Sequence, residues 1–420
     1  MKIAIISSLF LAGALATPAI GQSAPKLPPP DTSHAVTNYP VVTGWPDGVT
    51  PTAPNGYEVV EFARSLDYPR QMLVLPNGDV LVAEAKTIFK MDAEKTPDKI
   101  KGHAVSLAAG TSANRITLLR DTDGDGVADW RTILVDDLSQ PFGMAAIDGK
   151  LYVANTDGLV HFPFTPGDTT IDAAPTKAMP LSAGGYNNHW TRNLLPSADG
   201  RTLFISVGSA SNVAEKGMEV EKGRAAIHAY DIASGKSRLF ASGLRNPVGM
   251  DWAPDGKTLW TAVNERDGLG DDLVPDYITS VKEGGFYGWP YSYFGQHEDL
   301  RRKGEAPALV ARAIVPDQAV GSHVAALGLL FAPEGFAPGA LVARHGSWNR
   351  STLSGYDVVL VPFSGGKPAA PQPFLSGFLG DADAQSVYGR PVSLQKTAKS
   401  ELLVADDAGG RIWLVRKQAP

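Results

Sequence analysis

The chain has 420 residues, of which 43% are hydrophobic and 20% charged, and it contains 44 glycines and 32 prolines. This composition supplies enough apolar material for a sizeable core and is too rich in turn residues for a mainly helical protein. A formal net charge of −6 argues against nucleic-acid binding. The absence of cysteine excludes disulfides, thiolate metal sites and hydrolysis through a cysteine nucleophile.

The first 21 residues have the pattern of a secretory signal peptide. Lys2 precedes a short apolar run that ends near Ala16, and small residues follow it. A membrane anchor is the alternative interpretation, but the run is shorter than the roughly 20 residues that a spanning helix needs. We therefore expect cleavage, a periplasmic location and no integral membrane segment. Residues 22–55 are rich in proline, serine and threonine, and we interpret them as a linker or a wrapped arm.

From residue 56 onward one pattern recurs six times, in which a turn signal leads into a short β-rich run. Asn-Gly or Asp-Gly before such a run is the strongest local hairpin signal. The six runs cover residues 80–84, 151–155, 202–206, 258–262, 340–343 and 401–406. Their spacing predicts an all-β fold, a six-bladed β-propeller of four-stranded antiparallel blades over residues 56–416. A different all-β fold with a chance series of turns is the alternative.

Two further expectations follow from the propeller. Few helices should occur, because almost nothing after residue 56 shows a sustained 3.6-residue period. The last strand, within residues 410–415, should pair with the first strand near Tyr57 and close the ring.

A second regularity places basic residues just before each hairpin. Equivalent blade positions face the same end of a propeller, so these residues should gather round one mouth. They are Arg70, His189, Arg192, Arg245, His323 and Arg390. A ring of arginine and histidine on a net-acidic protein is typical of a site for an anionic ligand.

His189 is the leading catalytic candidate. A neutral histidine can accept the proton of a substrate hydroxyl near pH 7, as the oxidation of an alcohol requires. A lone histidine is more often a structural residue, but its blade position and the neighbouring Arg192 favour a role in the site.

The stretch from residue 243 to residue 290 combines donors with a flexible acidic loop. Arg245 and Asn246 offer a guanidinium and an amide that suit carboxylate or quinone oxygens, with a surface ion pair as the alternative. The loop that contains Asp267, Gly268, Asp271 and Asp272 can present carboxylates and backbone carbonyls to a hard cation, or it is a solvated turn. Residues 345–350 are dense in donors, and we interpret His345 and Arg350 as lining the site.

A separate acidic loop is predicted to bind Ca²⁺ in a structural role. Its carboxylates stand at loop positions 1, 3, 5 and 9, and they belong to Asp121, Asp123, Asp125 and Asp129. Thr132 stands where an EF-hand has a bidentate glutamate, so an EF-hand is incomplete. An acidic surface turn is the alternative interpretation.

Five motifs occur together in this chain, namely Asn188-His189, Leu244-Arg245-Asn246-Pro247, Gly284-Gly285-Phe286-Tyr287-Gly288-Trp289-Pro290, His345-Gly346-Ser347-Trp348-Asn349-Arg350 and Arg390-Pro391-Val392. Together they resemble the soluble dehydrogenases for sugars that depend on pyrroloquinoline quinone (PQQ), in particular the L-sorbosone dehydrogenase-like branch. The resemblance covers roughly residues 56–416. No dinucleotide-binding loop, phosphate loop or nucleophile elbow competes with this interpretation.

The resemblance implies a six-bladed propeller with PQQ above the channel and Ca²⁺ bridging the cofactor and the protein. It implies that His189 is the base and that Arg245 polarises the quinone carbonyl that receives the hydride. Asn246 and Arg390 correspond to further PQQ contacts. Arg266, Asp267 and Gly268 fall where the cofactor calcium takes backbone oxygens, and Asp271 and Asp272 fall where additional calcium often binds. Arg344-His345 stands where the glucose-oxidising members have a lysine.

The sequence thus predicts a PQQ- and Ca²⁺-dependent dehydrogenase for a sugar or a related alcohol or aldehyde. Electrons would pass from PQQ to an external acceptor, a cytochrome or a quinone. A calcium-dependent hydrolase resembling a lactonase, and a propeller that only binds glycans or proteins, are the alternatives.

Overall fold

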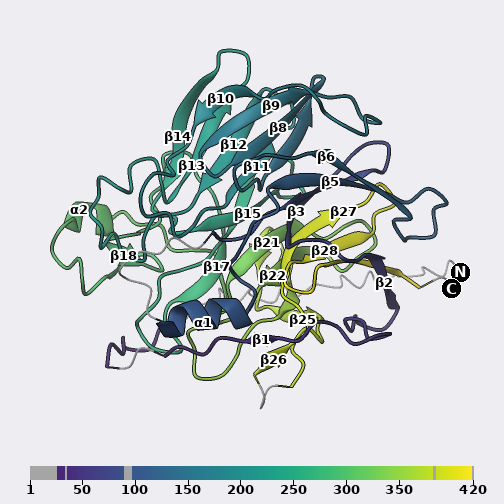
Figure 1. The fold of residues 1–420 in the computed structure, drawn as a ribbon. Coiled ribbons are helices and arrows are strands. Elements are labelled where there is room, and N and C mark those ends of the chain that lie inside the picture. Colours follow the sequence, from purple (N-terminus) through teal and green to yellow (C-terminus); the bar gives the residue numbers. More distant parts are fainter. Residues whose placement is uncertain (1–25, 34–35, 89–96, 382–384, 419–420) are drawn as a thin grey trace, which may run out of the picture.

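The computed structural model describes residues 26–33, 36–88, 97–381 and 385–418, so the predicted signal peptide lies outside the described residues. Six four-stranded antiparallel blades form a ring, which confirms the predicted six-bladed β-propeller (Figure 1). The described part also contains two short helices, α1 (Pro97–Val105) and α2 (Pro307–Val310). Neither helix is long and apolar enough to cross a membrane.

In blades 1 to 5 the strands follow the chain from the channel outward. Blade 1 has β3 (Pro69–Val74), β4 (Val80–Glu84), β5 (Arg115–Arg120) and β6 (Trp130–Val135). Blade 2 has β7 (Met144–Ile147), β8 (Lys150–Asn155), β9 (Gly158–Pro163) and β10 (Thr176–Pro180). Blade 3 has β11 (Arg192–Pro196), β12 (Thr202–Val207), β13 (Ala226–Asp231) and β14 (Lys236–Ser242).

Blades 4 and 5 carry additional short strands, and blade 6 takes its outermost strand from the start of the ring. Blade 4 has β15 (Pro247–Trp252), β16 (Leu259–Val263), β17 (Pro275–Ser280) and β20 (Gln318–Ser322), and β18 (Ser292–Tyr293) pairs with β19 (His297–Glu298) in its long insertion. Blade 5 has β21 (Ala326–Phe331), β22 (Gly339–Arg344), β23 (Asp357–Ser364) and β25 (Gln372–Leu375), with β24 (Lys367–Pro368) beside β23. Blade 6 has β27 (Pro391–Lys396), β28 (Leu402–Asp406), β29 (Arg411–Lys417) and β2 (Tyr57–Ala63).

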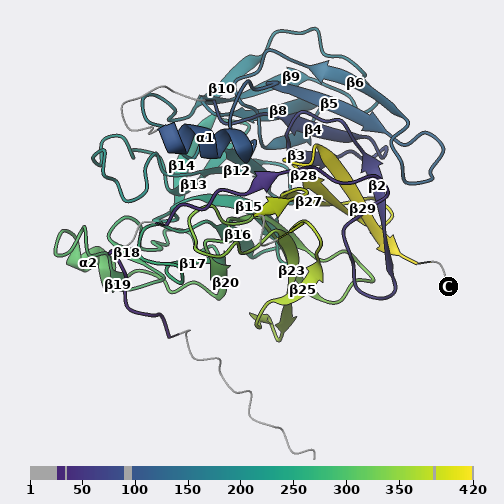
Figure 2. The ribbon, with the colours of Figure 1, turned by 60° about the horizontal axis from the view of Figure 1, so that its bottom comes forward.

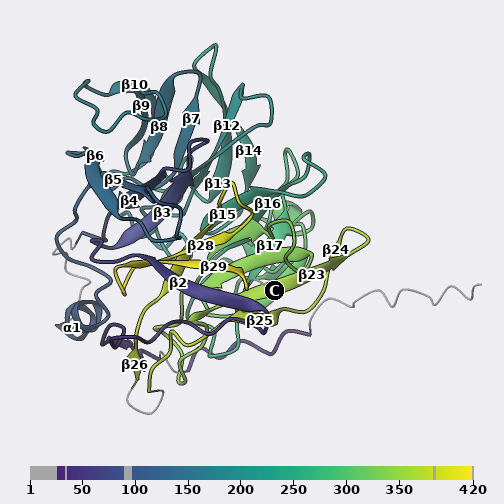
Figure 3. The same ribbon diagram turned by 90° about the vertical axis from the view of Figure 1, so that its right-hand side faces the viewer.

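The ring closes as the sequence predicts, because the first blade strand pairs with the last (Figure 3). β2 lies antiparallel to β29, with Tyr57 opposite Lys417 and Val60 opposite Leu414. The six predicted hairpin runs coincide with the second strand of each blade, and their turns include glycines with positive φ, such as Gly78 at 90° and Gly200 at 68°. An L side chain would be strained there, so these turns require the glycines that the sequence supplies.

The core consists of one buried apolar cluster at each interface between blades. In β4, Val80 and Val82 pack against blade 6, whereas Leu81 and Ala83 pack against blade 2. Successive residues of a strand point to opposite faces, so a strand that is covered on both faces needs an unbroken apolar run. β28 shows the same alternation towards blades 5 and 1.

The innermost strands β3, β7, β11, β15, β21 and β27 contact one another in order around the channel. In an antiparallel blade the first strand begins at the end where the second strand stops. The segments before the innermost strands and after the second strands therefore meet at one end of the ring. We call this end the mouth.

Residues 26–33 and 36–54, which we call the arm, lie along the mouth (Figure 2). The backbone amide of Asn38 donates to the backbone carbonyl of Trp348 at 2.7 Å, and β1 (Val41–Val42) pairs with β26 (Ser386–Val387). Further along, Trp45 Nε1 donates to the buried carboxylate of Asp406 at 2.6 Å. The arm is thus packed against blades 5 and 6.

Candidate functional site

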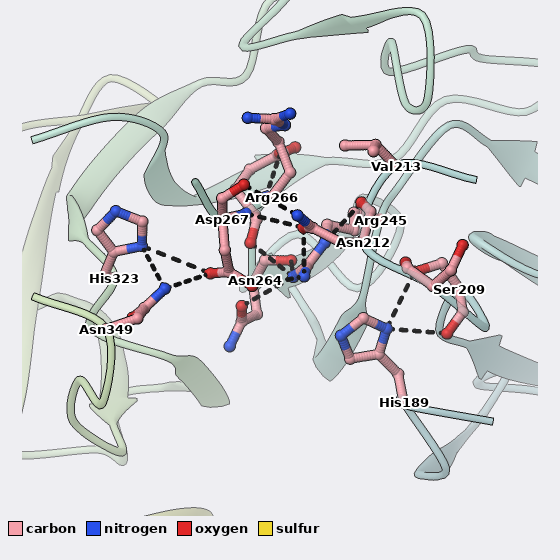
Figure 4. Close-up of polar contacts among 12 residues, drawn as sticks. His189, Ser209, Asn212, Val213, Arg245, Asn264, Arg266, Asp267, His323 and Asn349 are labelled. Atoms are coloured by element: carbon pink, nitrogen blue, oxygen red, sulfur yellow. Dashed lines mark hydrogen bonds and ion pairs between the residues drawn. The ribbon is translucent and has the colours of Figure 1, made fainter. Parts of the chain in front are cut away.

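His189 lies just before β11 with one ring nitrogen fixed by the protein. Its Nδ1 lies 2.8 Å from the carbonyl oxygen of Ser209 and 2.9 Å from the Ser209 hydroxyl (Figure 4). A carbonyl can only accept, so Nδ1 carries the proton and Nε2 is the acceptor. Burial, followed by the charge of Arg245, lowers the pKa of His189 to about 3. His189 is therefore a neutral base near pH 7, and Nε2 faces away from Ser209 on the side of Arg245.

Arg245, before β15 of the next blade, joins three chain segments through its buried guanidinium. Its Nη2 donates to Asn212 Oδ1 at 3.0 Å and to Asp267 Oδ2 at 2.9 Å. Its Nη1 donates to the carbonyl of Glu265 at 2.6 Å and more weakly to Asn264 at 3.3 Å. These bonds fix the guanidinium plane beside His189, as Figure 4 shows.

Asp267 connects Arg245 to blade 5. Its Oδ1 accepts from Asn349 Nδ2 at 2.7 Å and lies 3.5 Å from His323 Nδ1. Although burial raises it, the pKa of Asp267 is held well below its usual range by Arg245, His323 and Asn349. Burial alone would lower the pKa of His323, but the contact with Asp267 raises it overall. This side of the mouth is a fixed, charged network.

A second polar cluster lies across the mouth, where blades 5, 6 and 1 meet. The buried Asp407 carboxylate pairs with Arg70 and accepts from His345 Nε2 at 2.9 Å. Arg390 donates to the carbonyls of His345 at 3.1 Å and Gly346 at 2.8 Å. Burial and Arg390 lower the pKa of His345 to about 4, so this ring is neutral. Arg390 Nη1 makes no hydrogen bond to the residues that the structure describes.

Three residues that the sequence predicts as cofactor contacts are buried. Arg192 is fully buried, and its guanidinium donates to the carbonyls of His189 and Ser182 at 2.7 and 2.8 Å, beneath the loop that carries the base. The Arg266 side chain points away from His189 (Figure 4) and pairs with buried Asp299 at 2.9 Å. The Asn246 amide oxygen is buried beside Gly208 and has no partner among the described residues. The guanidiniums of Arg192 and Arg266 are both buried away from the mouth, and a role of these two residues at the cofactor stays a prediction.

The acidic loop after Arg266 does not gather its carboxylates around one point. Asp267 is engaged as described, Asp271 accepts from the Ser351 amide at 3.2 Å, and Asp272 accepts from Arg350 Nη2 at 2.7 Å. The Arg350 guanidinium therefore lies at the rim, where it holds this loop. The backbone carbonyls of Arg266 and Gly268 accept no hydrogen bond from any described residue.

The predicted calcium loop before β6 has three converging carboxylates. Asp121, Asp123 and Asp125 can each direct an oxygen to one point, with the oxygens within 4.8 Å of one another. The fourth predicted ligand, Asp129, instead accepts from the amide and hydroxyl of Thr122. Asp129 stabilises the turn, and it does not belong to the converging group.

A polar cleft of about 460 Å³ opens beside the Asp407 cluster, between blades 6 and 1. Lys86 and Asp67 pair across it at 3.0 Å, and the 407–410 turn forms one wall. The cleft is on the side of the ring opposite His189, which belongs to blade 3.

Several hydrogen-bond partners of the site residues were not predicted from the sequence, although the blade repeat contains a signal for two of them. Asp407 follows β28 and Ser209 follows β12, which is the position of His345 after β22. Extending the same rule to all six blades would have selected both. Asn212 has no such signal, because it lies in a loop whose length differs from blade to blade, whereas Asn349 lies within the 345–350 stretch that the sequence already indicates.

Comparisons with known proteins match this architecture. The TrAA12-like family matches residues 51–276 and 309–418. The calcium structure of a Trichoderma reesei enzyme of carbohydrate-active family AA12 superposes with a TM-score of 0.71 at 21% identity, covering 92% of this chain and 100% of the other. The holo form of the pyranose dehydrogenase PQQ domain from Coprinopsis cinerea gives 0.69 at 20% identity, covering 89% and 99%. At these identities the superpositions support the fold.

A curated relative extends the comparison to sequence. The PQQ-dependent pyranose dehydrogenase of Coprinopsis cinerea is 23% identical over 434 aligned positions, which cover 87% of this chain and 54% of the relative. The chain thus spans about half the length of that relative. The sorbosone-type branch suggested by the motifs stays a prediction.

Proposed function

This chain belongs to the TrAA12-like family, and we propose that it is a PQQ- and Ca²⁺-dependent dehydrogenase that oxidises a sugar or a related alcohol or aldehyde hydrate. The pairing of His189 with Arg245 carries the proposal. Ser209 holds the proton on Nδ1, so Nε2 is ready to accept the proton of a substrate hydroxyl. Arg245, fixed by Asn212 and Asp267, places a positive charge beside that base, where negative charge develops during the reaction.

The residues present fit an anionic quinone cofactor. PQQ, when bound, accepts the hydride that leaves the substrate carbon. Arg245 on one side and Arg390 on the other bring positive charge to the mouth, and the neutral His345 lies beside Arg390. These side chains would hold the carboxylate and carbonyl oxygens of the cofactor, because a guanidinium matches such oxygens.

We also propose two kinds of calcium site. The backbone carbonyls of Arg266 and Gly268, which accept no hydrogen bond from a described residue, suit a cation beside the cofactor, since Ca²⁺ prefers oxygen ligands. The convergent Asp121, Asp123 and Asp125 suit a structural ion in blade 1. Asp271 and Asp272 support an additional ion less, because Ser351 and Arg350 already engage them.

Reconstitution of the apoprotein tests the proposal. PQQ and Ca²⁺ are added to chelator-treated protein, and the absorption spectrum and dye reduction are followed with a panel of aldoses, pyranoses and sugar aldehydes. We expect a bound-quinone spectrum that changes on adding a substrate, together with dye reduction. No PQQ binding and no dye reduction across the panel would overturn the proposal. Lactone opening without PQQ would instead favour the hydrolase alternative.

The setting of the reaction belongs to the same proposal. We place the protein in the periplasm, with a cytochrome or a quinone as the external electron acceptor, because the first 21 residues resemble a signal peptide. Cell fractionation followed by N-terminal sequencing checks the location. A mature protein that starts near residue 22 in the periplasmic fraction is the expected result, and an intact Met1 in the cytoplasmic fraction would contradict it.

A further inference from the structure

One loop carries the partners of both reactive side chains. The 208–213 loop, between β12 and β13, supplies Ser209, which fixes the ring of His189. Three residues later it supplies Asn212, which accepts from Arg245 at 3.0 Å and holds both backbone polar groups of Asp267 at 2.9 Å. A shift of this loop would therefore move the base and the guanidinium together.

Two carboxylates hold four successive amides of this loop. The amides of Ala210 and Ser211 donate to Glu221 at 2.7 and 3.0 Å. The next two amides, at positions 212 and 213, donate to Glu215 at 3.2 and 2.8 Å. A carboxylate that accepts two consecutive amides fixes the backbone more strongly than neutral acceptors do.

Of these two carboxylates, Glu221 is the one that a chain of hydrogen bonds links to His189. It is 5% exposed and also accepts the hydroxyl of Ser211. The carbonyl of Ser211 in turn accepts the Ser209 hydroxyl at 2.7 Å. Because that hydroxyl donates its proton to Ser211, its oxygen is left to accept from His189 Nδ1. The hydrogen bonds thus run from Glu221 through Ser211 and Ser209 to the base.

The turn that contains Glu221 also supports the loop that carries His189. Arg224 Nη1 donates to Asn187 Oδ1 at 2.6 Å, and the same oxygen accepts from Arg192 Nη2 at 3.1 Å. Arg192 also holds the carbonyl of His189. Both sides of the His189–Ser209 pair are therefore tied to residues 221–224.

We propose that Glu221 is a positioning residue that fixes the tautomer and orientation of His189 through the 208–213 loop. The proposal rests on the proposed function, because it assigns Glu221 to the geometry of the same base. Glu221→Gln keeps the size of the side chain but replaces one carboxylate oxygen with an NH₂ group, which faces one of the two amides of Ala210 and Ser211. Two donors then oppose each other, so the loop moves and His189 loses its fixed proton position.

The first test measures the tautomer in the apoprotein, without cofactor or turnover. Long-range ¹H–¹⁵N spectra of the imidazoles are compared in the wild type and Glu221→Gln, with His189→Asn used to assign the His189 signal. We expect one tautomer, protonated at Nδ1, in the wild type and a mixture in Glu221→Gln. A His189 spectrum that is unchanged in Glu221→Gln would overturn the proposal, whether or not the protein proves to be a dehydrogenase.

The second test measures turnover of the reconstituted holoprotein. Loss of a group that orients a functional side chain commonly lowers activity 10- to 100-fold, so we expect kcat to fall about 10-fold or more with KM within about 2-fold. Glu221→Asp keeps the charge and should recover part of kcat. Glu219→Gln is the matched control, because Glu219 lies on the same turn and is 83% exposed. An equal loss of kcat in the control would contradict the proposal.

Ser211→Ala keeps the inference testable if Glu221→Gln does not fold. It removes one bond to Glu221 and leaves the carboxylate with its two amides. We expect a smaller change in the same direction, in both the tautomer spectrum and kcat. Wild-type values in both measurements would count against the chain of hydrogen bonds.

Discussion

His189 has no carboxylate on Nδ1, and this sets its pH dependence. Ser209 offers only neutral oxygens, while burial and Arg245 lower the pKa of His189 to about 3. A base acts in its deprotonated form, so a lowered pKa keeps it active at lower pH. We expect kcat/KM of the holoenzyme to show no loss near pH 6.5 that is due to this histidine. A pH–rate profile between pH 4 and 8 checks this, and an acid limb with an apparent pKa near 6.5 would contradict it.

The same pKa has a consequence for stability. Between pH 6.5 and 3 the unfolded chain binds a proton at His189 and the folded protein does not. The contribution of this residue to the free energy of unfolding therefore falls as the pH drops through that window. Denaturant unfolding of the wild type and His189→Asn at pH 7 and pH 5 gives this contribution as a difference. A difference that does not change with pH would show that the folded pKa is close to its ordinary value.

Arg245→Lys tests whether the shape of the guanidinium matters as well as its charge. Arg245 reaches Asn212, Glu265 and Asp267 at once, and a lysine ammonium cannot span these acceptors. We expect kcat/KM to fall roughly 100-fold, by the magnitude that one lost transition-state donor typically costs. Steady-state kinetics of the reconstituted enzyme measures it.

Arg238→Lys is the matched control for that substitution. Arg238 lies on the outer strand β14 and pairs with Glu283, and both side chains are more than half exposed. Such a surface pair contributes little, so wild-type kinetics are expected. If the two variants behaved alike, the specific role of Arg245 would be refuted.

Blade position alone predicts which segments reach the mouth, but not which side chains face it. Arg70 and Arg192 occupy comparable positions, yet Arg70 joins the Asp407 cluster and Arg192 lies under its own loop. Neighbouring residues on a strand point to opposite faces, so a shift of one or two positions changes what a side chain contacts. The bonds of Arg192 to nearby backbone carbonyls depend on loop shape, which the sequence pattern does not contain.

At the scale of elements, turns were predictable because their signals are local. Gly78 and Gly200 need positive φ, and this requirement shows directly in the residue type. The short helix α1 and the course of the arm were not predicted in the same detail. Contacts with distant residues such as Trp348 and Asp406 hold the arm, and no short-range pattern reports such contacts.

The acidic loop before β6 gives a prediction for calcium binding. Asp123 belongs to the converging group, whereas Asp129 bonds to Thr122. We expect Ca²⁺ to raise the Tm of PQQ-free wild type, since a ligand at about 100 times its Kd stabilises by about 2.7 kcal/mol. Asp123→Asn should lose the rise in Tm that comes from Ca²⁺ at this loop, and Asp129→Asn should keep most of that rise. Thermal unfolding with Ca²⁺ and with a chelator measures it, and equal shifts in all three proteins would argue against a site at Asp123.

At the scale of the whole molecule, the ring explains why the number of blades could be predicted. Each blade contributes an apolar run that is buried on both faces, and each of the six interfaces has one cluster. Because each blade of a radial repeat contains one such hairpin, the number of hairpins gives the number of blades. The arm repeats nothing, so its path over blades 5 and 6 follows from its own contacts, such as the packing of Trp45 against Phe378 and Trp413.

Two truncations separate the role of the arm from ring closure. Removing residues 1–54 deletes Trp45 but leaves β2, and removing residues 1–63 deletes β2 as well. The first truncated protein should remain folded, and its free energy of unfolding should be about 3–5 kcal/mol lower, which is typical for truncating a buried tryptophan. The second leaves β29 without its partner and opens the ring, so the cluster between blades 6 and 1 loses Phe62. We expect it to show no cooperative thermal transition by circular dichroism. A cooperative transition close to that of the first truncation would mean that the pairing of β2 with β29 is not what holds the ring closed.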